Sequence, residues 1–472
     1  MNLNTGETID LTPLKGVTAS VLSISSNFPE EIIVGLNDRI PQLHDLYRIN
    51  ISSGERTLIL ENPGFAGFII DMDYNVRFAA RVTEISETEY MASSENGSWE
   101  SFMKVPFDDT ATTALIWIDK TGQAVNMKDS RDRDTSALYV MDIETGNKTL
   151  IAEDSKADVS DIIIHPTERT VQAVAFTYER KYWQIVDESI VQDLDYLKTV
   201  ADGEVGILSR TLDDRCWIVY YLMDNGPIKY YYYDRNASEA QFLFTDRNAL
   251  EGLSLAMMHS VVIKSRDGLD LVSYYTLPVG SDPDDDGYPN NPLPLVLVVH
   301  GGPWHRDNWG YSSKDQWMAN RGYAVLKVNF RGSTGFGKSF LSAGYGEWGR
   351  KMHNDLIDGV EWAINKGIAD PDKVAIFGGS YGGYSTLWGM INTSEYFACG
   401  VDVVGPTNLT TLFEAMPLYW EPLIEQMVRR LGVDFRTEEG KAYLDTISPI
   451  TYVDQIQKPL LIVQGANDVR CL

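Results

Sequence analysis

The chain has 472 residues, of which 44% are hydrophobic and 23% charged, and its net charge is −27. A chain of this length predicts two or three domains, each able to bury its own core. The strong negative charge argues against nucleic acid or an anionic membrane as a partner, because like charges repel each other.

Cysteine usage and hydropathy narrow the possible class of protein further. Cys216, Cys399 and Cys471 show neither CxxC nor metal-ligand spacing, so we expect no disulfide framework and no metal site. No apolar run reaches the roughly 18 residues that cross a bilayer, and residues 1–20 lack a signal-peptide pattern. The cytoplasm is therefore the default compartment, and we expect no cofactor.

Residues 1–255 are predicted to form a β-propeller. Short aromatic and β-branched runs alternate there with Asn-Gly, Thr-Gly and Ser-Gly turns. Tyr47, Tyr139 and Tyr231 lie 92 residues apart, as do Tyr90 and Tyr182. Half of that spacing is close to the roughly 40–50 residues of a four-stranded blade. We therefore expect about five to six blades, an incomplete propeller, with an irregular β-sandwich as the alternative.

One hairpin in this half is specific enough to place. The run Trp217–Tyr221 is followed by the turn Asp224-Asn225-Gly226 and then by the tyrosines 230–233. An Asn-Gly pair between two apolar runs favours a tight antiparallel turn. The pattern predicts two adjacent strands of one blade.

Residues 256–472 are predicted to form an α/β-hydrolase domain. A hairpin is expected first, with strands at 261–264 and 270–279. Compact apolar runs typical of a buried parallel sheet follow, and residues 352–367 carry a one-sided apolar pattern typical of a helix. Alternating strands and helices indicate an α/β fold. The expected parallel strands are 295–300, 324–330, 374–377, 401–404 and 460–464.

The polar loop between the expected strands 270–279 and 295–300 contains part of a calcium-binding pattern. Asp282, Asp284 and Asp286 precede a glycine, which is how a calcium loop starts. The twelfth position is Leu293, where such a loop requires a bidentate glutamate. A solvated hairpin loop is the favoured interpretation.

The first catalytic element is Ser380. The run Val374–Phe377 leads into Gly378-Gly379-Ser380-Tyr381-Gly382, followed by a helix-forming segment. A Gly-x-Ser-x-Gly turn between a buried strand and a helix is the nucleophile elbow of an α/β-hydrolase. Alone the motif is weak, but in this context it predicts an exposed, reactive hydroxyl.

Two further elements accompany the serine. His300-Gly301-Gly302-Pro303-Trp304 directly follows the strand 295–299, where unobstructed backbone N–H groups could hold an oxyanion, although a plain turn is the alternative. His300 is expected to hold this loop rather than to move protons. Asp468 follows the last apolar strand and lies 88 residues after Ser380, which fits the chain order serine, acid, histidine. A turn aspartate that caps the next helix is the alternative there.

Four motifs resemble the prolyl oligopeptidase family of serine peptidases, and most closely its bacterial dipeptidyl-aminopeptidase and acylaminoacyl-peptidase type. The propeller pattern extends the resemblance over nearly the whole chain. It implies that Ser380 is the nucleophile, Asp468 the acid, and the amides of Gly302 and Tyr381 the oxyanion hole. The motifs are 300–303, 329–337, 378–384 and 465–470.

The resemblance departs at the general base. In the family a histidine follows the acid, whereas all six histidines of this chain precede Ser380. Without a base the hydroxyl is a poor nucleophile. We therefore interpret the sequence as part of a longer peptidase, truncated at the C-terminus and apparently within the N-terminal domain, which could be inactive as given.

The complete enzyme is expected to hydrolyse short peptides through an acyl-enzyme. Arg331 could bind a substrate carboxylate or carbonyl, with a structural ion pair as the alternative, and Tyr419 and Trp420 could line a pocket or simply pack in the core. An esterase with the same elbow, and a non-catalytic pseudoenzyme or scaffold, are the alternative functions. Residue specificity and oligomeric state stay open.

Overall fold

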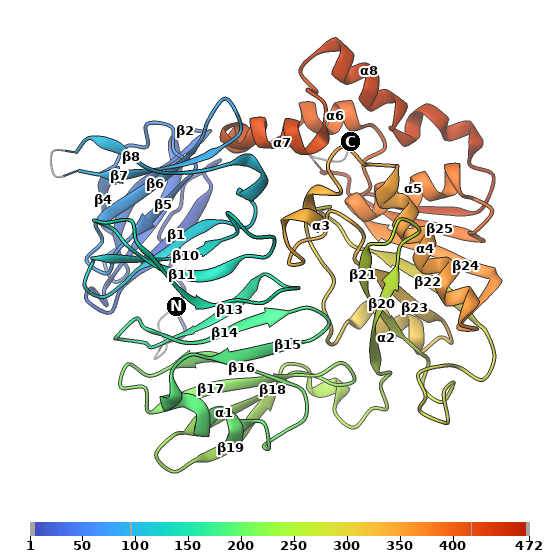
Figure 1. Cartoon of the computed structure of the whole chain (residues 1–472), viewed down its shortest axis with the longest axis horizontal. Helices are drawn as coiled ribbons and strands as arrows, with labels where there is room; N and C mark the ends of the chain where they lie inside the picture. The colour runs from blue at the N-terminus through green and yellow to red at the C-terminus, as the bar shows by residue number, and fades with distance from the viewer. Residues whose placement is uncertain (1–4, 95–96, 417, 469–472) are drawn as a thin grey trace. The chain divides into compact units, whose positions relative to one another are not determined.

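The computed structural model describes residues 5–94, 97–416 and 418–468 (Figure 1). Contacts within the chain divide it into two compact units, and each unit takes residues from separate stretches of sequence. The first unit comprises Met1–Arg131, Leu138–Leu150 and Met416–Arg429, and the second comprises Asp132–Ala137, Ile151–Ala415 and Arg430–Leu472.

Three antiparallel sheets of four strands form most of the first unit. Their strands pair in chain order, so each sheet is a meander, which is how the blade of a propeller is built (Figure 1). Blade 1 contains β1 (Ala19–Ile24), β2 (Glu31–Ile40), β3 (Leu43–Asn50) and β4 (Arg56–Leu60); blade 2 contains β5 (Gly67–Ile70), β6 (Val76–Val82), β7 (Thr88–Ser93) and β8 (Trp99–Val105); blade 3 contains β9 (Ala114–Ile118), β10 (Ala124–Asp129), β11 (Ala137–Asp142) and β12 (Lys148–Ala152).

Two further sheets of the same kind belong to the second unit. Blade 4 has three strands and blade 5 has four. The residues that the structure describes therefore form five blades of a β-propeller. Blade 4 contains β13 (Val159–Ile164), β14 (Val171–Thr177) and β15 (Lys181–Ile185); blade 5 contains β16 (Glu204–Arg210), β17 (Cys216–Leu222), β18 (Lys229–Asp234) and β19 (Glu239–Thr245).

The tyrosine spacing seen in the sequence corresponds to this repeat. Tyr47, Tyr90, Tyr139, Tyr182 and Tyr231 each lie on the third strand of a different blade. The 92-residue spacing is therefore the length of two blades. The prediction of a propeller rather than an irregular sandwich is confirmed.

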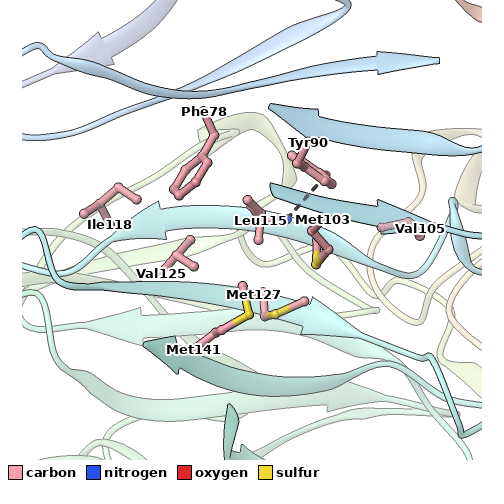
Figure 2. Packing of buried hydrophobic residues seen from close by; sticks show 9 residues of the cluster. All are labelled: Phe78, Tyr90, Met103, Val105, Leu115, Ile118, Val125, Met127 and Met141. Atoms are coloured by element: carbon pink, nitrogen blue, oxygen red, sulfur yellow. Dashed lines mark hydrogen bonds between the residues drawn. The ribbon is translucent and has the colours of Figure 1, made fainter. Parts of the chain in front are cut away.

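Apolar side chains from neighbouring blades form the core of the first unit (Figure 2). Phe78 and Tyr90 come from blade 2, and Leu115 and Val125 from blade 3. The hydroxyl of Tyr90 accepts a hydrogen bond from the backbone N–H of Leu115 at 3.3 Å, so the one polar atom of this ring is satisfied where it is buried (Figure 2). Burial of both blades against each other compensates for the small core that one meander can make.

Blade 5 shows how the tyrosine-rich hairpin packs. Strands β17 and β18 are antiparallel neighbours, as predicted, and Trp217 lies opposite Tyr233 and Tyr221 opposite Lys229. The side chains of Trp217, Tyr221 and Tyr233 are fully buried in a cluster that also includes Leu194 of a short helix. Burying rings of this size contributes roughly 2–3 kcal/mol each.

A seven-stranded sheet forms the centre of the remaining part of the second unit. Its order is β20-β21-β23-β22-β24-β25-β26; the first two pairings are antiparallel and the rest parallel. All five expected parallel strands and the leading hairpin are present, so the α/β-hydrolase prediction is confirmed. The strands are β20 (Met258–Lys264), β21 (Asp270–Thr276), β22 (Leu293–Val299), β23 (Ala324–Val328), β24 (Ala369–Gly379), β25 (Cys399–Val403) and β26 (Leu460–Val463).

Helices cover both faces of this sheet because its side chains alternate along each strand. On one face, Val296 and Val325 pack against Met318 of α2 (Ser313–Ala319). On the other, Gly359 of α4 (Lys351–Asn365) approaches Val328, where a Cβ would lie 2.5 Å from the valine side chain. The predicted helix over 352–367 matches α4 within two residues.

Side-chain caps fix where several other helices begin. The hydroxyl of Ser312 accepts from the N–H of Asp315 at α2, and Asn408 and Thr437 cap two later helices in the same way. Among the described residues no helix is long and apolar enough to cross a membrane. The remaining helices are α1 (Val191–Leu197), α3 (Lys338–Ser342), α5 (Tyr381–Asn392), α6 (Leu409–Glu414), α7 (Ile424–Leu431) and α8 (Glu438–Thr446), with 3₁₀ turns at Phe107–Asp109, Glu188–Ile190, Asn248–Leu250, Leu418–Leu423 and Pro449–Gln455.

Candidate active site

Ser380 stands alone between strand β24 and helix α5. Its φ of 57° and ψ of −121° are unfavourable for a residue with a side chain, and its side chain is exposed. Its N–H donates to the carbonyl of Val403 at 3.0 Å, and its own carbonyl accepts from Tyr384 at 3.0 Å. Hydrogen bonds on both sides thus hold a strained turn that lifts the hydroxyl out of the sheet.

The glycines of the elbow are required by backbone contact. A Cβ on Gly378 would lie 2.0 Å from the carbonyl oxygen of Gly382. A Cβ on Gly382 would lie 2.1 Å from the carbonyl oxygen of Val299, at the end of β22. Since neither carbonyl can move without distorting the sheet or the helix, any larger residue would push the elbow apart.

The glycine loop after β22 lies against the serine. A Cβ on Gly301 would lie 3.5 Å from Cβ and 4.0 Å from Oγ of Ser380. Gly302, the next residue, is exposed, and its backbone N–H is one of the two predicted oxyanion donors. Tyr381 is the first residue of α5, so its N–H has no acceptor within the helix. That these two N–H groups form an oxyanion hole stays a prediction.

The side chain of His300 holds this glycine loop in place. Its Nε2 lies 3.1 Å from Oγ of Ser333 and its Nδ1 lies 2.8 Å from the carbonyl oxygen of Gly301. The ring stacks on Phe330 with centroids 4.4 Å apart. Burial lowers the pKa of His300 below its usual value. A buried ring with both nitrogens hydrogen-bonded fits a structural role, as expected from the sequence.

Asp468 lies in the loop after β26, at the same edge of the sheet where Ser380 follows β24. Strands β24, β25 and β26 are parallel neighbours, with Gly379 opposite Val403 and Val403 opposite Val463. Two strand spacings separate the ends of β24 and β26, or about 10 Å. Asp468 is half-buried in a turn in which its N–H donates to Gly465 at 3.2 Å. Its role as the acid stays a prediction, and Val469 and Arg470 of the same motif lie outside the described residues.

Arg331 is held in a buried ion pair between two carboxylates. Four of the five N–H groups of its guanidinium donate, to Asp355 at 2.8 and 2.6 Å and to Asp267 at 2.8 and 2.7 Å. Hydrogen bonds from Arg331 and Ser265 hold the pKa of Asp267 well below its usual range. These contacts favour the structural reading of Arg331 over its role as a substrate ligand.

Tyr419 and Trp420 belong to the first compact unit, whereas Ser380 belongs to the second. The ring of Tyr419 lies edge-on to His44 of blade 1, with centroids 6.4 Å apart. Tyr419 also lines a cavity of about 240 Å³, together with residues of blades 1 and 2 such as Phe68. A role for this pair in substrate binding stays a prediction.

Asp402 is a buried carboxyl beside the elbow that the sequence reasoning did not single out. It is 1% exposed, lies opposite Gly378 in the sheet, and accepts a hydrogen bond from the N–H of Gly405 at 2.9 Å. Burial raises its pKa to about 6. The signal that could have found it is a single charged residue inside the apolar run 401–404.

Metal ligands do not gather at this site in the part of the chain that the structure describes. No group of three or more His, Cys, Asp or Glu side chains there could hold an ion. Cys216 and Cys399 are free and half-buried. Cys216 lies in blade 5, with its Sγ 2.9 Å from the hydroxyl of Tyr232.

Comparison with known sequences places the fold and the elbow in one family. Residues 309–472 match the model described as the prolyl oligopeptidase family. The chain is 48% identical over 471 residues to dipeptidyl aminopeptidase BIII of Pseudoxanthomonas mexicana, covering all of this chain and 68% of that protein. It is 36% identical to dipeptidyl peptidase family member 6 of Caenorhabditis elegans, covering 96% of this chain and 64% of that protein.

Solved structures show the same fold. A puromycin-hydrolysing peptidase of Mycobacterium tuberculosis superposes with a TM-score of 0.72 at 17% identity, over 97% of this chain and 71% of that one. An acylaminoacyl peptidase of Pyrococcus horikoshii superposes with a TM-score of 0.60 at 18% identity, over 96% and 79% of the two chains. With its propeller blades, its hydrolase sheet and its close relatives in sequence, this chain belongs to the prolyl oligopeptidase family of serine peptidases.

Proposed function

We propose that Ser380 is the nucleophile of a peptidase that hydrolyses short peptides through an acyl-enzyme. The observation that carries the proposal is the exposed serine on a strained turn, with Gly301 packed beside it. Such a turn stores about 1–3 kcal/mol of backbone strain, which persists only when surrounding hydrogen bonds hold it. A hydroxyl presented in this way suits attack on a carbonyl carbon.

In this mechanism the hydroxyl of Ser380 attacks the peptide carbonyl and a general base removes its proton. The N–H groups of Gly302 and Tyr381 hold the oxygen that becomes negative, and the leaving amine takes the proton. Water then hydrolyses the ester on Ser380. Asp468 orients the base and stabilises its charged form.

The proposal assigns the base to a histidine outside these 472 residues. In this fold the chain order is serine, acid, histidine, and every histidine here precedes Ser380. The two buried ones are already engaged: His300 contacts Ser333, and His353 contacts Thr393 at 2.8 Å. Without a base that reaches Ser380, the hydroxyl is expected to react slowly at best.

The substrate class follows from the relatives. Both are named for dipeptidyl release, so the removal of N-terminal dipeptides is the activity to test first. The chain spans about two thirds of the length of these relatives, so the test uses this chain joined to a family-type tail that carries a histidine.

The test measures hydrolysis of dipeptidyl and acyl-peptide p-nitroanilides, together with p-nitrophenyl esters, by this joined protein. We expect peptide-bond cleavage and labelling of Ser380 by a fluorophosphonate. Ser380→Ala should abolish both, while Ser385→Ala, at a buried serine of the following helix α5, should keep them. A folded product that cleaves only esters would overturn the peptidase proposal, and one that is never labelled would overturn the nucleophile.

A further inference from the structure

The loop that carries Gly302 ends in an aromatic side chain with a cation on its face. Trp304 is half-buried, two residues beyond Gly302 and three beyond Gly301, which packs against Ser380. The guanidinium carbon of Arg430 lies 5.4 Å from the centre of the Trp304 ring. Both residues belong to the second compact unit, as does Ser380. The pair therefore lies at the glycine loop that packs against Ser380.

Arg430 lacks the hydrogen-bond acceptors that hold two other arginines of this unit. Arg331 donates to two carboxylates, and Arg306 donates to the carbonyl oxygens of Thr177 and Tyr178 at 2.7 and 2.8 Å. Within the described residues no carboxylate, carbonyl or hydroxyl accepts from the Arg430 side chain, and its Nε is buried without a hydrogen-bond partner. A guanidinium without an acceptor has donors that a ligand with a matching acceptor could use.

The Arg430 guanidinium lies over the Trp304 ring, within the range of a cation–π contact. A guanidinium carries its N–H donors in a planar fork. A fork of this kind matches a carboxylate, which accepts two parallel hydrogen bonds. In a protein of net charge −27, a cation without a carboxylate partner attracts an anionic group locally, against the overall field.

We propose that Arg430, held on Trp304, binds a carboxylate of the peptide substrate. This inference rests on the proposed function, because it assumes that peptides occupy the site beside Ser380. The carboxylate could be the C-terminus of a short peptide or the side chain of an Asp or Glu residue. Arg430 is thereby a residue that determines specificity, and it takes no part in the bond-breaking step.

The test measures binding at equilibrium, by calorimetry, to the full chain carrying Ser380→Ala so that no peptide is cut. Three peptides serve as probes: tetra-alanine with a free C-terminus, tetra-alanine amide, and Ala-Ala-Ala-Glu amide. We expect the free acid to bind about 10-fold more tightly than tetra-alanine amide, as a charge-assisted bidentate contact should provide. A similar gain for the glutamyl amide would identify a side chain as an equivalent source, and no gain would restrict the subsite to the C-terminus.

Arg430→Gln should remove this preference, and Arg430→Lys should keep part of it because a point charge remains. Arg429→Gln is the matched control: the preceding residue lies 4.2 Å above the ring of Phe107 in the first unit, and its loss should leave the preference intact. Trp304→Leu removes the ring that Arg430 contacts and leaves α7 unchanged, so it should also weaken the preference for the acid. It tests the same contact if the Arg430 variants do not fold.

Equal binding of acid and amide to the parent chain, or a preference that survives Arg430→Gln, would overturn the inference and leave the proposed function standing. If none of the peptides binds to a folded protein, the proposed function fails, and the inference falls with it. Higher salt should reduce the preference for the acid, since the contact is between charges.

Discussion

Blade 5 and the elbow are both buried and hydrogen-bonded, but opposite means hold them together. In blade 5, large side chains fill the space between strands: Trp217, Tyr221 and Tyr233 are at most 1% exposed. At the elbow, side chains are missing, and the backbone of Gly378 and Gly382 touches other backbone directly. A blade therefore tolerates changes that keep volume, whereas the elbow tolerates no added atom.

Adding one methyl group at the elbow should have the largest effect and tests this comparison most directly. Gly382→Ala would place Cβ 2.1 Å from the carbonyl oxygen of Val299, so β22 and α5 must separate. We expect a loss of more than about 4 kcal/mol in the free energy of unfolding, beyond the ordinary range for overpacking. Urea denaturation followed by circular dichroism measures it. Gly367→Ala, at a turn with no atom near its Cβ, separates the effect of contact from that of backbone strain.

The two regions also hold buried charges in mirrored ways. In blade 5, Asp214 lies between Arg210 and Arg235, each 2.5 Å away, whereas beside the hydrolase sheet Arg331 lies between two aspartates. Arg331→Met would leave Asp355, which is fully buried, without its cation. We expect a loss of about 3–4 kcal/mol, measured as a shift of the urea midpoint.

The control for that change is an exposed ion pair in the same sheet. Lys373 and Asp370 are 2.8 Å apart at the surface, and Lys373→Ala should leave the midpoint unchanged because water screens the pair. An equal shift in both variants would mean that burial does not decide the value of a charge pair in this protein.

A change in blade 5 tests its reliance on volume. Trp217→Phe removes part of a fully buried ring and the N–H that donates to Asp214 at 2.8 Å. We expect a loss of about 2 kcal/mol, from the cavity and the unpaired carboxylate together. Thermal melting followed by near-ultraviolet circular dichroism measures it. If the loss matched that of Gly382→Ala, the contrast between the two regions would be wrong.

The smallest expected effect concerns the carboxyl below the elbow and is a gain. Because burial raises the pKa of Asp402 to about 6, the folded chain holds more protons than the unfolded chain between about pH 4 and 6, and stability falls as pH rises through this window. Asp402→Asn removes the charge but keeps the oxygen that accepts from Gly405. It should stabilise the protein by about 1–2 kcal/mol at pH 8 and by little at pH 4.

Urea midpoints of both proteins at pH 4, 5, 6 and 8 measure this difference. Asp284→Asn, in the exposed loop after β21, serves as the control and should show no dependence of this kind. A constant difference at all four pH values would contradict a role for ionisation at residue 402.

Short motifs and one long-range repeat in the sequence were enough to predict most of the fold. The tyrosine spacing predicted the length of a blade, and the turn at 224–226 predicted that the strands containing Trp217 and Tyr233 are neighbours. The elbow was predictable for the same reason, since its strand, turn and helix are contiguous. The domain boundary near residue 255 stays a prediction, although the topology changes from blades to the larger sheet between β19 and β20.

Contacts between distant residues were out of reach of such patterns. Nothing near Arg331 in the sequence reveals that Asp267 and Asp355 surround it, so its role stayed ambiguous until the structure was known. The same holds for Arg430 on Trp304, which are 126 positions apart. Asp402 is intermediate, because its neighbours announce a buried strand but not what a carboxyl would meet there.

The division into units has a consequence for how this protein can be taken apart. The polypeptide passes from one unit to the other after residues 131, 137, 150, 415 and 429, and the last of these passages lies within α7. No single cut can release either half as an uninterrupted fragment. Shortened expression clones that end at a conventional linker would carry orphaned pieces of the other half, so modular exchange with relatives requires grafting several stretches at once.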